Sequence, residues 1–269
     1  MVWTDTHVHF DSFEKTGETA AVLARALTAG VLRCVAIGGS PEANAGALRI
    51  AADFPDRIRA AIGFDRHRVH CPSSLESLDS QLALSETVAV GECGLDYAGG
   101  QEDAQAQRDL FEDMLTCAVK HHLPMVVHTR RADADTLAML RNYAVARAAA
   151  DGPEPGASPP GLVHCFTGGI AFAEALVDMG WFISLSGIVT FHNAKALRET
   201  VRRIPIDRLL LETDTPYLAP APLRGKPNEP SYLPHTGREV AALLNLHEEE
   251  LARITSENAA RIFAWPAVD

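Results

Sequence analysis

Two histidines separated by one residue stand close to the start of the chain, in the segment Asp5-Thr6-His7-Val8-His9. Alternate side chains of a strand point to the same side, so His7 and His9 would share one face with Asp5. Neutral imidazoles placed in this way can bind one metal ion together. The alternative is a pair of histidines held by hydrogen bonds at the end of a strand, and this segment alone leaves both interpretations open.

Further residues of metal-binding types occur at the ends of other short apolar runs. Glu92, His128, His164 and Asp214 each stand at the end of such a run or directly after it. If the runs are parallel strands of one barrel, their carboxyl ends meet on the rim that carries the active site in such folds. Imidazole and carboxylate groups are ligands for divalent metals. Six side chains therefore predict a metal site: His7, His9, Glu92, His128, His164 and Asp214.

The number of these ligands favours two metal ions over one. A single catalytic zinc ion usually takes three protein ligands and a water molecule. We assign His7, His9 and Asp214 to one ion, His128 and His164 to the other, and Glu92 as the bridge between them. We expect two divalent ions, such as zinc, manganese or magnesium, and the many imidazoles favour zinc, manganese, cobalt or nickel over magnesium.

The elements that must position these residues are short β-rich runs separated by longer segments with apolar residues at helical spacing. The expected strands are Val2–Val8, Leu32–Ile37, Ile58–Phe64, Val88–Glu92, Met125–His128, Leu162–Phe166, Phe182–Gly187 and Leu209–Thr213. The clearest expected helices are Thr19–Ala29, Ala104–His121, Ala132–Ala149 and Lys195–Ile204.

This alternation of strand and helix is typical of parallel βα units. Eight units within about 250 residues predict an α/β fold, a single (β/α)8 barrel. The segment His235–Phe263 predicts extra C-terminal helices, with Asn245 between two of them. Because the alternation resumes after the Pro- and Gly-rich stretch Asp151–Gly161, we interpret that stretch as a flexible surface loop and expect residues 1–269 to form one domain.

Composition narrows the function classes. The chain has 269 residues, a net charge of −11 and 47% hydrophobic residues. A chain with this net charge has no overall attraction for duplex nucleic acid or for an anionic membrane surface. Because its basic residues are sparse, we expect only weak nucleic-acid binding without sequence specificity. The five cysteines are scattered, and neither a signal peptide nor a membrane span is evident. We expect a cytoplasmic protein, a monomer, with reduced thiols.

Several longer motifs follow one another along the chain in the order DTHVHF, GECGLDY, VVHTR, HCFTGG, SGIVTFHNA, LLETDTPYLAP and RGKPNEPSYLP. With them the chain resembles the TatD family of metal-dependent hydrolases over nearly its whole length. The resemblance implies a TIM barrel of the amidohydrolase superfamily, a two-metal site and deoxyribonuclease activity, often 3′→5′ exonucleolytic on single strands. The family's metal ligands match His7, His9, Glu92, His128, His164 and Asp214.

The sequence departs from the family pattern after the third expected strand. Many relatives have the motif G-x-H-P there, whereas this chain has Gly63-Phe64-Asp65-Arg66. Asp65 thus replaces a histidine that faces the substrate in our interpretation. His192 stands where relatives often carry lysine. These changes leave the metal ligands intact and bear on substrate preference.

Two-metal chemistry suggests roles for individual residues. A water molecule between the ions attacks the substrate, and Asp214 is the candidate to accept its proton, while Glu92 holds the ions together. Asp5 would orient an imidazole. Arg130, Arg224 and Lys226 are candidates for substrate binding on the same side of the barrel, and the alternative for each is a solvated surface residue.

We therefore predict a divalent-metal-dependent hydrolase, a deoxyribonuclease that cleaves phosphodiester bonds of single-stranded DNA in the 3′→5′ direction. A second hypothesis keeps the metals but assigns an ester or amide substrate, since some TatD-like proteins act as D-aminoacyl-tRNA deacylases. A glutamate bridge, where many amidohydrolases have a carboxylated lysine, favours phosphoester chemistry by analogy. A third hypothesis is a non-catalytic protein that binds metal for stability, although structural sites are normally closed.

Overall fold

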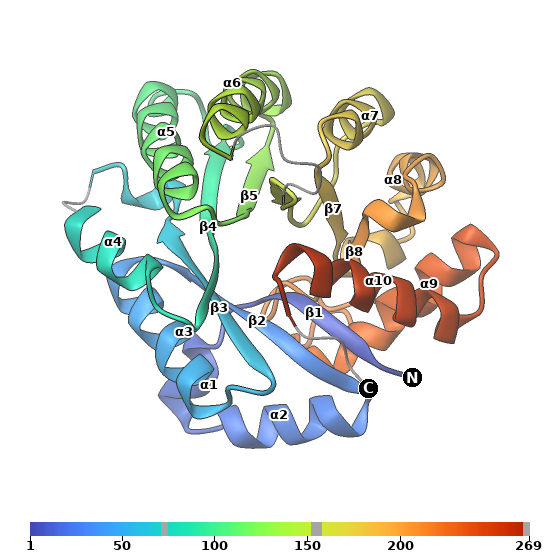
Figure 1. Ribbon diagram of the computed structural model, residues 1–269. Helices are drawn as coiled ribbons and strands as arrows, with labels where there is room; N and C mark the ends of the chain where they lie inside the picture. Colours follow the sequence, from blue (N-terminus) through green and yellow to red (C-terminus); the bar gives the residue numbers. More distant parts are fainter. Residues whose placement is uncertain (71–74, 152–157, 266–269) are drawn as a thin grey trace.

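The computed structural model describes residues 1–70, 75–151 and 158–265. In these residues eight strands form one sheet, and each strand pairs in parallel with the next one along the chain (Figure 1). The strands are β1 (Trp3–Val8), β2 (Val31–Gly39), β3 (Ile58–Phe64), β4 (Thr87–Asp96), β5 (Met125–Arg130), β6 (Gly161–Val163), β7 (Phe182–Leu185) and β8 (Leu209–Leu211).

The chain that follows β8 returns to β1 and nearly closes the sheet into a barrel. Val8 forms a parallel bridge with Thr215. The backbone N–H of Asp214 donates to the carbonyl of His7 at 3.1 Å, and that of His9 donates to the carbonyl of Thr215 at 2.9 Å. Three of the predicted metal ligands, His7, His9 and Asp214, therefore take part in the backbone hydrogen bonds that join β1 to the segment after β8.

Helices surround the barrel on its outside (Figure 1). The α-helices are α1 (Asp11–Thr16), α2 (Thr19–Thr28), α3 (Pro41–Asp53), α4 (Leu75–Leu82), α5 (Ala104–His121), α6 (Asp133–Asp151), α7 (Ile170–Asp178), α8 (Lys195–Val201), α9 (Leu233–Leu244) and α10 (Glu248–Ile262). Short 3₁₀ helices are η1 (Arg66–Arg68), η2 (Gly187–Thr190), η3 (Ile206–Arg208) and η4 (Pro230–Tyr232). The predicted (β/α)8 TIM barrel with additional C-terminal helices is confirmed.

Local sequence signals explain where several helices begin and end. The Ser40 hydroxyl accepts a hydrogen bond from the N–H of Ala43, and Pro41 follows at the first helical position, so α3 begins there. The helix predicted over Ala104–His121 is observed with the same bounds. Asn245 ends α9 in the left-handed conformation, as expected of a stop between two helices.

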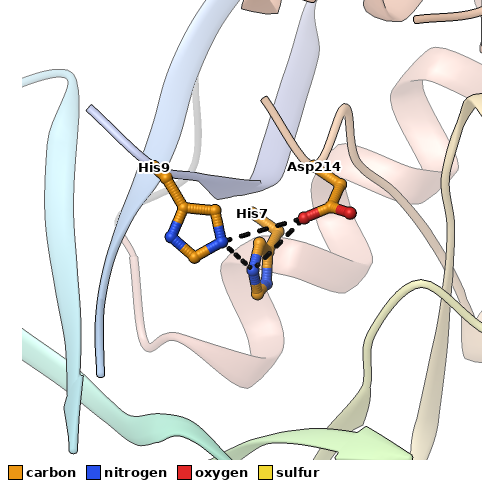
Figure 2. Close-up of side chains that lie close together, drawn as sticks. All are labelled: His7, His9 and Asp214. Carbon is orange, nitrogen blue, oxygen red and sulfur yellow. Dashed lines mark hydrogen bonds and ion pairs between the residues drawn. The ribbon is translucent and has the colours of Figure 1, made fainter. Parts of the chain in front are cut away.

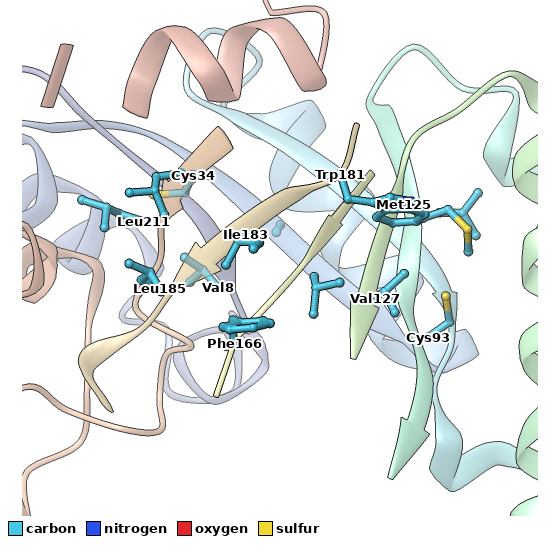
Figure 3. Packing of buried hydrophobic residues seen from close by; sticks show 14 of the residues in the cluster. Val8, Cys34, Cys93, Met125, Val127, Phe166, Trp181, Ile183, Leu185 and Leu211 are labelled. Atoms are coloured by element: carbon cyan, nitrogen blue, oxygen red, sulfur yellow. The ribbon is translucent and has the colours of Figure 1, made fainter. Parts of the chain in front are cut away.

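The apolar core has two parts. The larger part fills the space between the strands and the helices, and Figure 3 shows Met125, Phe166 and Trp181 within it. Gly237 allows α9 to pack closely on β1, because a Cβ atom at that position would lie 2.4 Å from the ring of Trp3. The smaller part lines the inside of the barrel and includes residues of α10.

Two strands carry an extra residue next to the predicted metal ligands. In the pairing of β1 with β2, Asp5 lies opposite Cys34 and Val8 opposite Ala36, so β1 uses three steps where β2 uses two. In the pairing of β4 with β5, the single step from Val126 to Val127 matches two steps of β4, on either side of Glu92. Such bulges change the direction of side chains and are common beside active sites.

Some predicted boundaries differ from the observed ones. Strand β4 continues four residues beyond Glu92 to Asp96, while β6 ends at Val163 and leaves His164 in the following loop. Of the predicted surface loop, residues 152–157 lie outside the described residues. Within the described ranges, none of the helices is both long and apolar enough to cross a bilayer.

Candidate metal centre

The six predicted ligands converge at the carboxyl end of the barrel. His7, Glu92 and His128 belong to β1, β4 and β5. The other three, His9, His164 and Asp214, lie in the loops that follow β1, β6 and β8. His7, Glu92, His164 and Asp214 are buried, whereas His9 and His128 are partly exposed. The strand ends thus bring together residues that are up to about two hundred positions apart in the sequence.

Glu92 lies at the centre of the cluster. Its Oε2 is 3.4 Å from Nε2 of His7 and 3.6 Å from Nε2 of His9. Its Oε1 is 3.3 Å from Nδ1 of His128 and 3.5 Å from Nε2 of His164. Each carboxylate oxygen therefore faces a different pair of imidazoles.

The first group of donors consists of His7, His9 and Asp214 (Figure 2). The Nε2 atoms of the two histidines are 3.2 Å apart, and Asp214 Oδ1 lies 3.8 Å from each of them. Asp214 adopts a left-handed backbone conformation with φ 59°, which turns its side chain toward β1 directly after β8. These donor atoms all lie within 4.8 Å of one another, so one ion could contact all three.

The second group consists of His128, His164 and the Oε1 atom of Glu92. His128 Nδ1 lies 3.1 Å from His164 Nε2. Gly94 makes the close approach of β4 to β5 possible, because a Cβ atom there would lie 2.1 Å from the carbonyl oxygen of His128. The sequence motif Gly-Glu-Cys-Gly thus lets the strand that carries Glu92 approach the strand that carries His128.

The protonation of three of the imidazoles suits a cation-binding site. Burial lowers the pKa of His7 and His128, and it lowers that of His9 to about 4, so these imidazoles are neutral and offer lone pairs. The Nε2 atoms of His7 and His9 face each other at 3.2 Å, so a cation near both could accept a lone pair from each neutral ring. The donor set therefore fits divalent metal ions.

His164 and Glu92 titrate as a pair. Burial alone would lower the pKa of His164, but the carboxylates of Glu92 and Glu212 outweigh burial and raise it to about 10. Burial alone would raise the pKa of Glu92, but His164 and the other imidazoles hold it well below its usual range. Burial raises the pKa of Asp214 to about 8.

Two carboxylates outside the predicted set support the imidazoles. Glu212 is fully buried, lies 3.4 Å from Nδ1 of His164 and accepts a hydrogen bond from the N–H of Cys165. Asp96 lies 3.3 Å from Nε2 of His128, and this hydrogen bond lowers the pKa of Asp96 to about 2. Such outer partners orient metal-binding imidazoles. The position of Glu212, two residues before the predicted ligand Asp214 at the end of a strand, is a sequence signal that could have identified Glu212 as a site residue.

Asp5 has a different role from the expected one. Its carboxylate accepts hydrogen bonds from the N–H and the hydroxyl of Thr213, at 2.9 and 2.6 Å, and from the N–H of His7. No imidazole ring is among these partners. Because the extra residue in β1 interrupts the alternation, Asp5 joins the start of the chain to the segment after β8 and leaves the donor cluster to His7 and His9.

The predicted substrate-binding residues lie at different places. Arg130 has a side chain that is 65% exposed, and it lies 3.9 Å from Asp96 beside the cluster. Arg224 packs over the ring of Phe191, and Lys226 is exposed in the same loop. Arg130 is thus close to the metal centre, whereas Arg224 and Lys226 line neither of the two hollows beside it.

These two hollows flank the metal centre. The first, of about 490 Å³, includes His9, Glu92, Lys15 and Tyr217. The second, of about 540 Å³, includes Asp96, Arg130 and the loop Gly99-Gly100. Arg66 and His67 line both of them. The first hollow therefore reaches two of the donors, and the second reaches Asp96, which contacts His128.

Sequence comparisons identify similar proteins. A family model described as TatD related DNase matches residues 4–264. The chain is 35% identical over 266 residues to the uncharacterized metal-dependent hydrolase YabD of Bacillus subtilis, which covers 96% of this chain and 98% of that protein. It is 33% identical over 266 residues to a protein of Edwardsiella piscicida named 3′-5′ ssDNA/RNA exonuclease TatD, covering 96% of this chain and 98% of that protein.

A solved structure agrees with these matches. The crystal structure of YjjV, a TatD homologue from Escherichia coli, superposes with a TM-score of 0.89 at 29% sequence identity, and the match covers 98% of each chain. The resemblance therefore extends over the barrel and its C-terminal helices.

Proposed function

Because the chain belongs to the TatD family of metal-dependent hydrolases, we propose that it hydrolyses phosphodiester bonds as a 3′→5′ exonuclease on single-stranded DNA. The observation that carries this proposal is the position of Glu92, whose two oxygens face two separate pairs of imidazoles. Pairs of ions bridged in this way are typical of enzymes that displace groups at phosphorus. The name of the relative from Edwardsiella piscicida supports the choice of substrate.

We assign the six donors to two divalent ions. His7, His9 and Asp214 would hold the first ion, and His128 and His164 would hold the second, with Glu92 between them. When bound, such ions supply a water nucleophile that ionises near neutral pH and neutralise charge that develops on the phosphate. The imidazoles favour zinc, manganese or cobalt at these positions.

The residues of the chain have separate roles in this reaction. Asp214 contacts His7 and His9 through Oδ1, and its second oxygen points away from both rings (Figure 2), so it is available to accept the proton of the attacking water. Asp96 orients His128 through a hydrogen bond to Nε2, and Glu212 orients His164 as an ion-pair partner 3.4 Å from Nδ1.

The hollow beside His9 fits a nucleotide. Tyr217, a residue that is 61% exposed, lines it, and Lys15 lines it as well. An exposed aromatic ring offers a face on which a base can stack without sequence preference, and a basic residue can attract the backbone phosphate. We propose that the terminal nucleotide of the strand lies here, with its phosphate at Glu92.

The test uses one single-stranded oligonucleotide labelled at either the 5′ or the 3′ end, with manganese, magnesium or cobalt added, or with EDTA. We expect metal-dependent cleavage, in which the 5′ label yields a ladder and the 3′ label yields a mononucleotide at once. Glu92→Gln, purified in the same way, should lose at least about a hundredfold in rate, because an uncharged amide cannot bridge the ions. Arg253→Gln, on α10, is the matched control.

No cleavage by metal-loaded protein would contradict the proposal. Cleavage that persists in the Glu92→Gln preparation would identify a contaminating nuclease. In either case we would next test ester substrates with the same series of metal ions, beginning with D-aminoacyl-tRNA.

A further inference from the structure

Arg66 brings a cation to the metal centre from the loop after β3. It is the first residue of η1, in the segment Gly63-Phe64-Asp65-Arg66. The N–H of Asp65 donates to the carbonyl of Gly39 at 2.9 Å, and the Asp65 carboxylate accepts from the N–H of His67 at 2.7 Å. These bonds hold the backbone on both sides of Arg66, so the direction of its side chain is determined by the loop.

The guanidinium reaches the oxygen at which the second group of donors meets. Its Nη1 forms an ion pair with Oε1 of Glu92, and its Nε lies 3.7 Å from Oδ2 of Asp96. The side chain is only 17% exposed, against 65% for Arg130. Its buried Nε has no hydrogen-bond partner among the described residues. The guanidinium of Arg66 also belongs to the lining of both hollows.

The charge around Arg66 changes when metal is bound. Glu92 Oε1 lies within 3.5 Å of His128 Nδ1 and His164 Nε2, so a cation in that group would share the carboxylate that Arg66 pairs with. Asp96 would remain as a distant partner. A guanidinium beside a dication in a largely buried site is unfavourable unless an anion joins them. Phosphate oxygens match the planar fork of a guanidinium and pair with two of its N–H groups.

We propose that Arg66 is a substrate-binding residue, which binds the non-bridging oxygens of the phosphate beside Glu92 and makes the site selective for a phosphoryl group. The proposal rests on the proposed function and deepens it, since it names the group that recognises the substrate. It also gives a role to the segment Gly63-Phe64-Asp65-Arg66, because the residue after Asp65 supplies a cation to the metal centre.

The test measures binding, not only turnover. Protein loaded with cobalt and freed of excess ion is titrated with inorganic phosphate in a calorimeter, and bound cobalt is counted in each preparation. Arg66→Gln should weaken phosphate binding by about tenfold to a hundredfold, because it loses charged hydrogen bonds. Arg66→Lys keeps the charge but loses the fork, so it should fall between Arg66→Gln and the unchanged protein. Arg253→Gln, at the opposite end of the barrel, should leave the affinity unchanged.

Two results would overturn the proposal. One is an unchanged phosphate affinity in Arg66→Gln at equal cobalt content, which would make Arg66 only a counter-charge for Glu92. The other is no measurable phosphate binding by the loaded protein. Circular dichroism of each variant excludes misfolding, and Arg66→Lys keeps the comparison valid if Arg66→Gln does not fold.

The outcomes also separate this proposal from the proposed function. Phosphate binding that depends on Arg66, in a protein that cleaves no DNA, would refute the exonuclease and leave the role of Arg66 intact. If the protein cleaves DNA but Arg66→Gln changes neither the KM nor the phosphate affinity, the role of Arg66 is refuted and the exonuclease proposal stands.

Discussion

The two ends of the barrel are built from the same strands but contain opposite chemistry. At the amino end, inward residues of the strands, such as Val35, Val126 and Leu210, pack against Ile262 and Phe263 near the end of α10. Asn258 of α10 donates to the carbonyl of Leu209, the first residue of β8, so this helix covers that opening. The carboxyl end instead buries imidazoles and carboxylates.

The difference shows that residues two positions apart on one strand can contribute separately to stability and to function. Val126 and His128 lie on the inward face of β5. In the same way, Leu162 of β6 and His164, which follows β6, both face the inside of the barrel. The apolar residue contributes to folding by leaving water, whereas the imidazole two positions later loses hydration and needs charged partners. The amino end should therefore tolerate metal removal, and the carboxyl end should depend on it.

The largest effect should follow from damage to the amino end. Phe263 is 2% exposed and packs inside the barrel, so Phe263→Ala should lower the free energy of unfolding by about 3–5 kcal/mol through the cavity it creates. The kcat/KM for DNA at 25 °C should stay within about twofold, because the site lies at the other end. Denaturant unfolding and steady-state rates measure the two quantities. A matching loss of kcat/KM would show that the ends are coupled.

Metal removal should act on the carboxyl end alone. EDTA should destabilise the loaded protein by about 3–4 kcal/mol, the contribution of a ligand present at a hundred to a thousand times its Kd. The same loss should appear in Phe263→Ala, because distant sites contribute independently. Thermal unfolding of both proteins, with and without EDTA, provides the test. An EDTA effect that depends on Phe263 would contradict the division between the ends.

Asp96→Asn should sharpen the distinction between ligands and the residues that orient them. Asp96 touches the cluster only through Nε2 of His128, at 3.3 Å. Loss of such an outer carboxylate typically reduces metal affinity or activity by about 10- to 100-fold. Cobalt titration should show weaker binding of one of two ions. Asp79→Asn, which removes a surface carboxylate paired with Lys120 and His121, is the control. Equal weakening of both ions would argue against a local role.

The smallest effect is expected at the rim. Tyr217→Ala should raise the KM for single-stranded DNA by about tenfold, since stacking of one base contributes about 1–3 kcal/mol. The free energy of unfolding of the Tyr217→Ala variant should barely change, because Tyr217 is 61% exposed. Tyr217→Phe keeps the stacking face and should retain the original KM. Cleavage rates over a range of oligonucleotide concentrations give KM and kcat separately, and a change confined to kcat would refute stacking.

Much of the fold could be predicted because local patterns and the final structure agree. The helix Ala104–His121 and the strand Ile58–Phe64 have the predicted bounds, since their apolar spacing matches the faces that become buried. The boundaries of β6 and β8 were less predictable. The predicted strands Leu162–Phe166 and Leu209–Thr213 extend past the observed ends at Val163 and Leu211, because a strand ends where its regular pairing with the neighbouring strands ends.

The surroundings of the cluster show the limits of local reasoning. Glu212 and Asp96 were not among the predicted site residues, although each pairs with one of the imidazoles. The local sequence around a carboxylate near a strand end does not indicate which histidine that carboxylate will contact. That pairing depends on the spacing between β4 and β5, and between β6 and the segment after β8.

The amino-acid sequence by itself determined the βα alternation and the presence of metal-binding side chains where strands end. His128 shows this clearly, because alternation from the inward Val126 is enough to turn it into the barrel. Only the tertiary structure decided how His7, Glu92 and Arg66 are aimed. His7 and Glu92 lie at bulges, where the register between two strands sets side-chain direction, and Arg66 is aimed by bonds between its loop and Gly39. Register and loop contacts join distant segments, so no local pattern contains them.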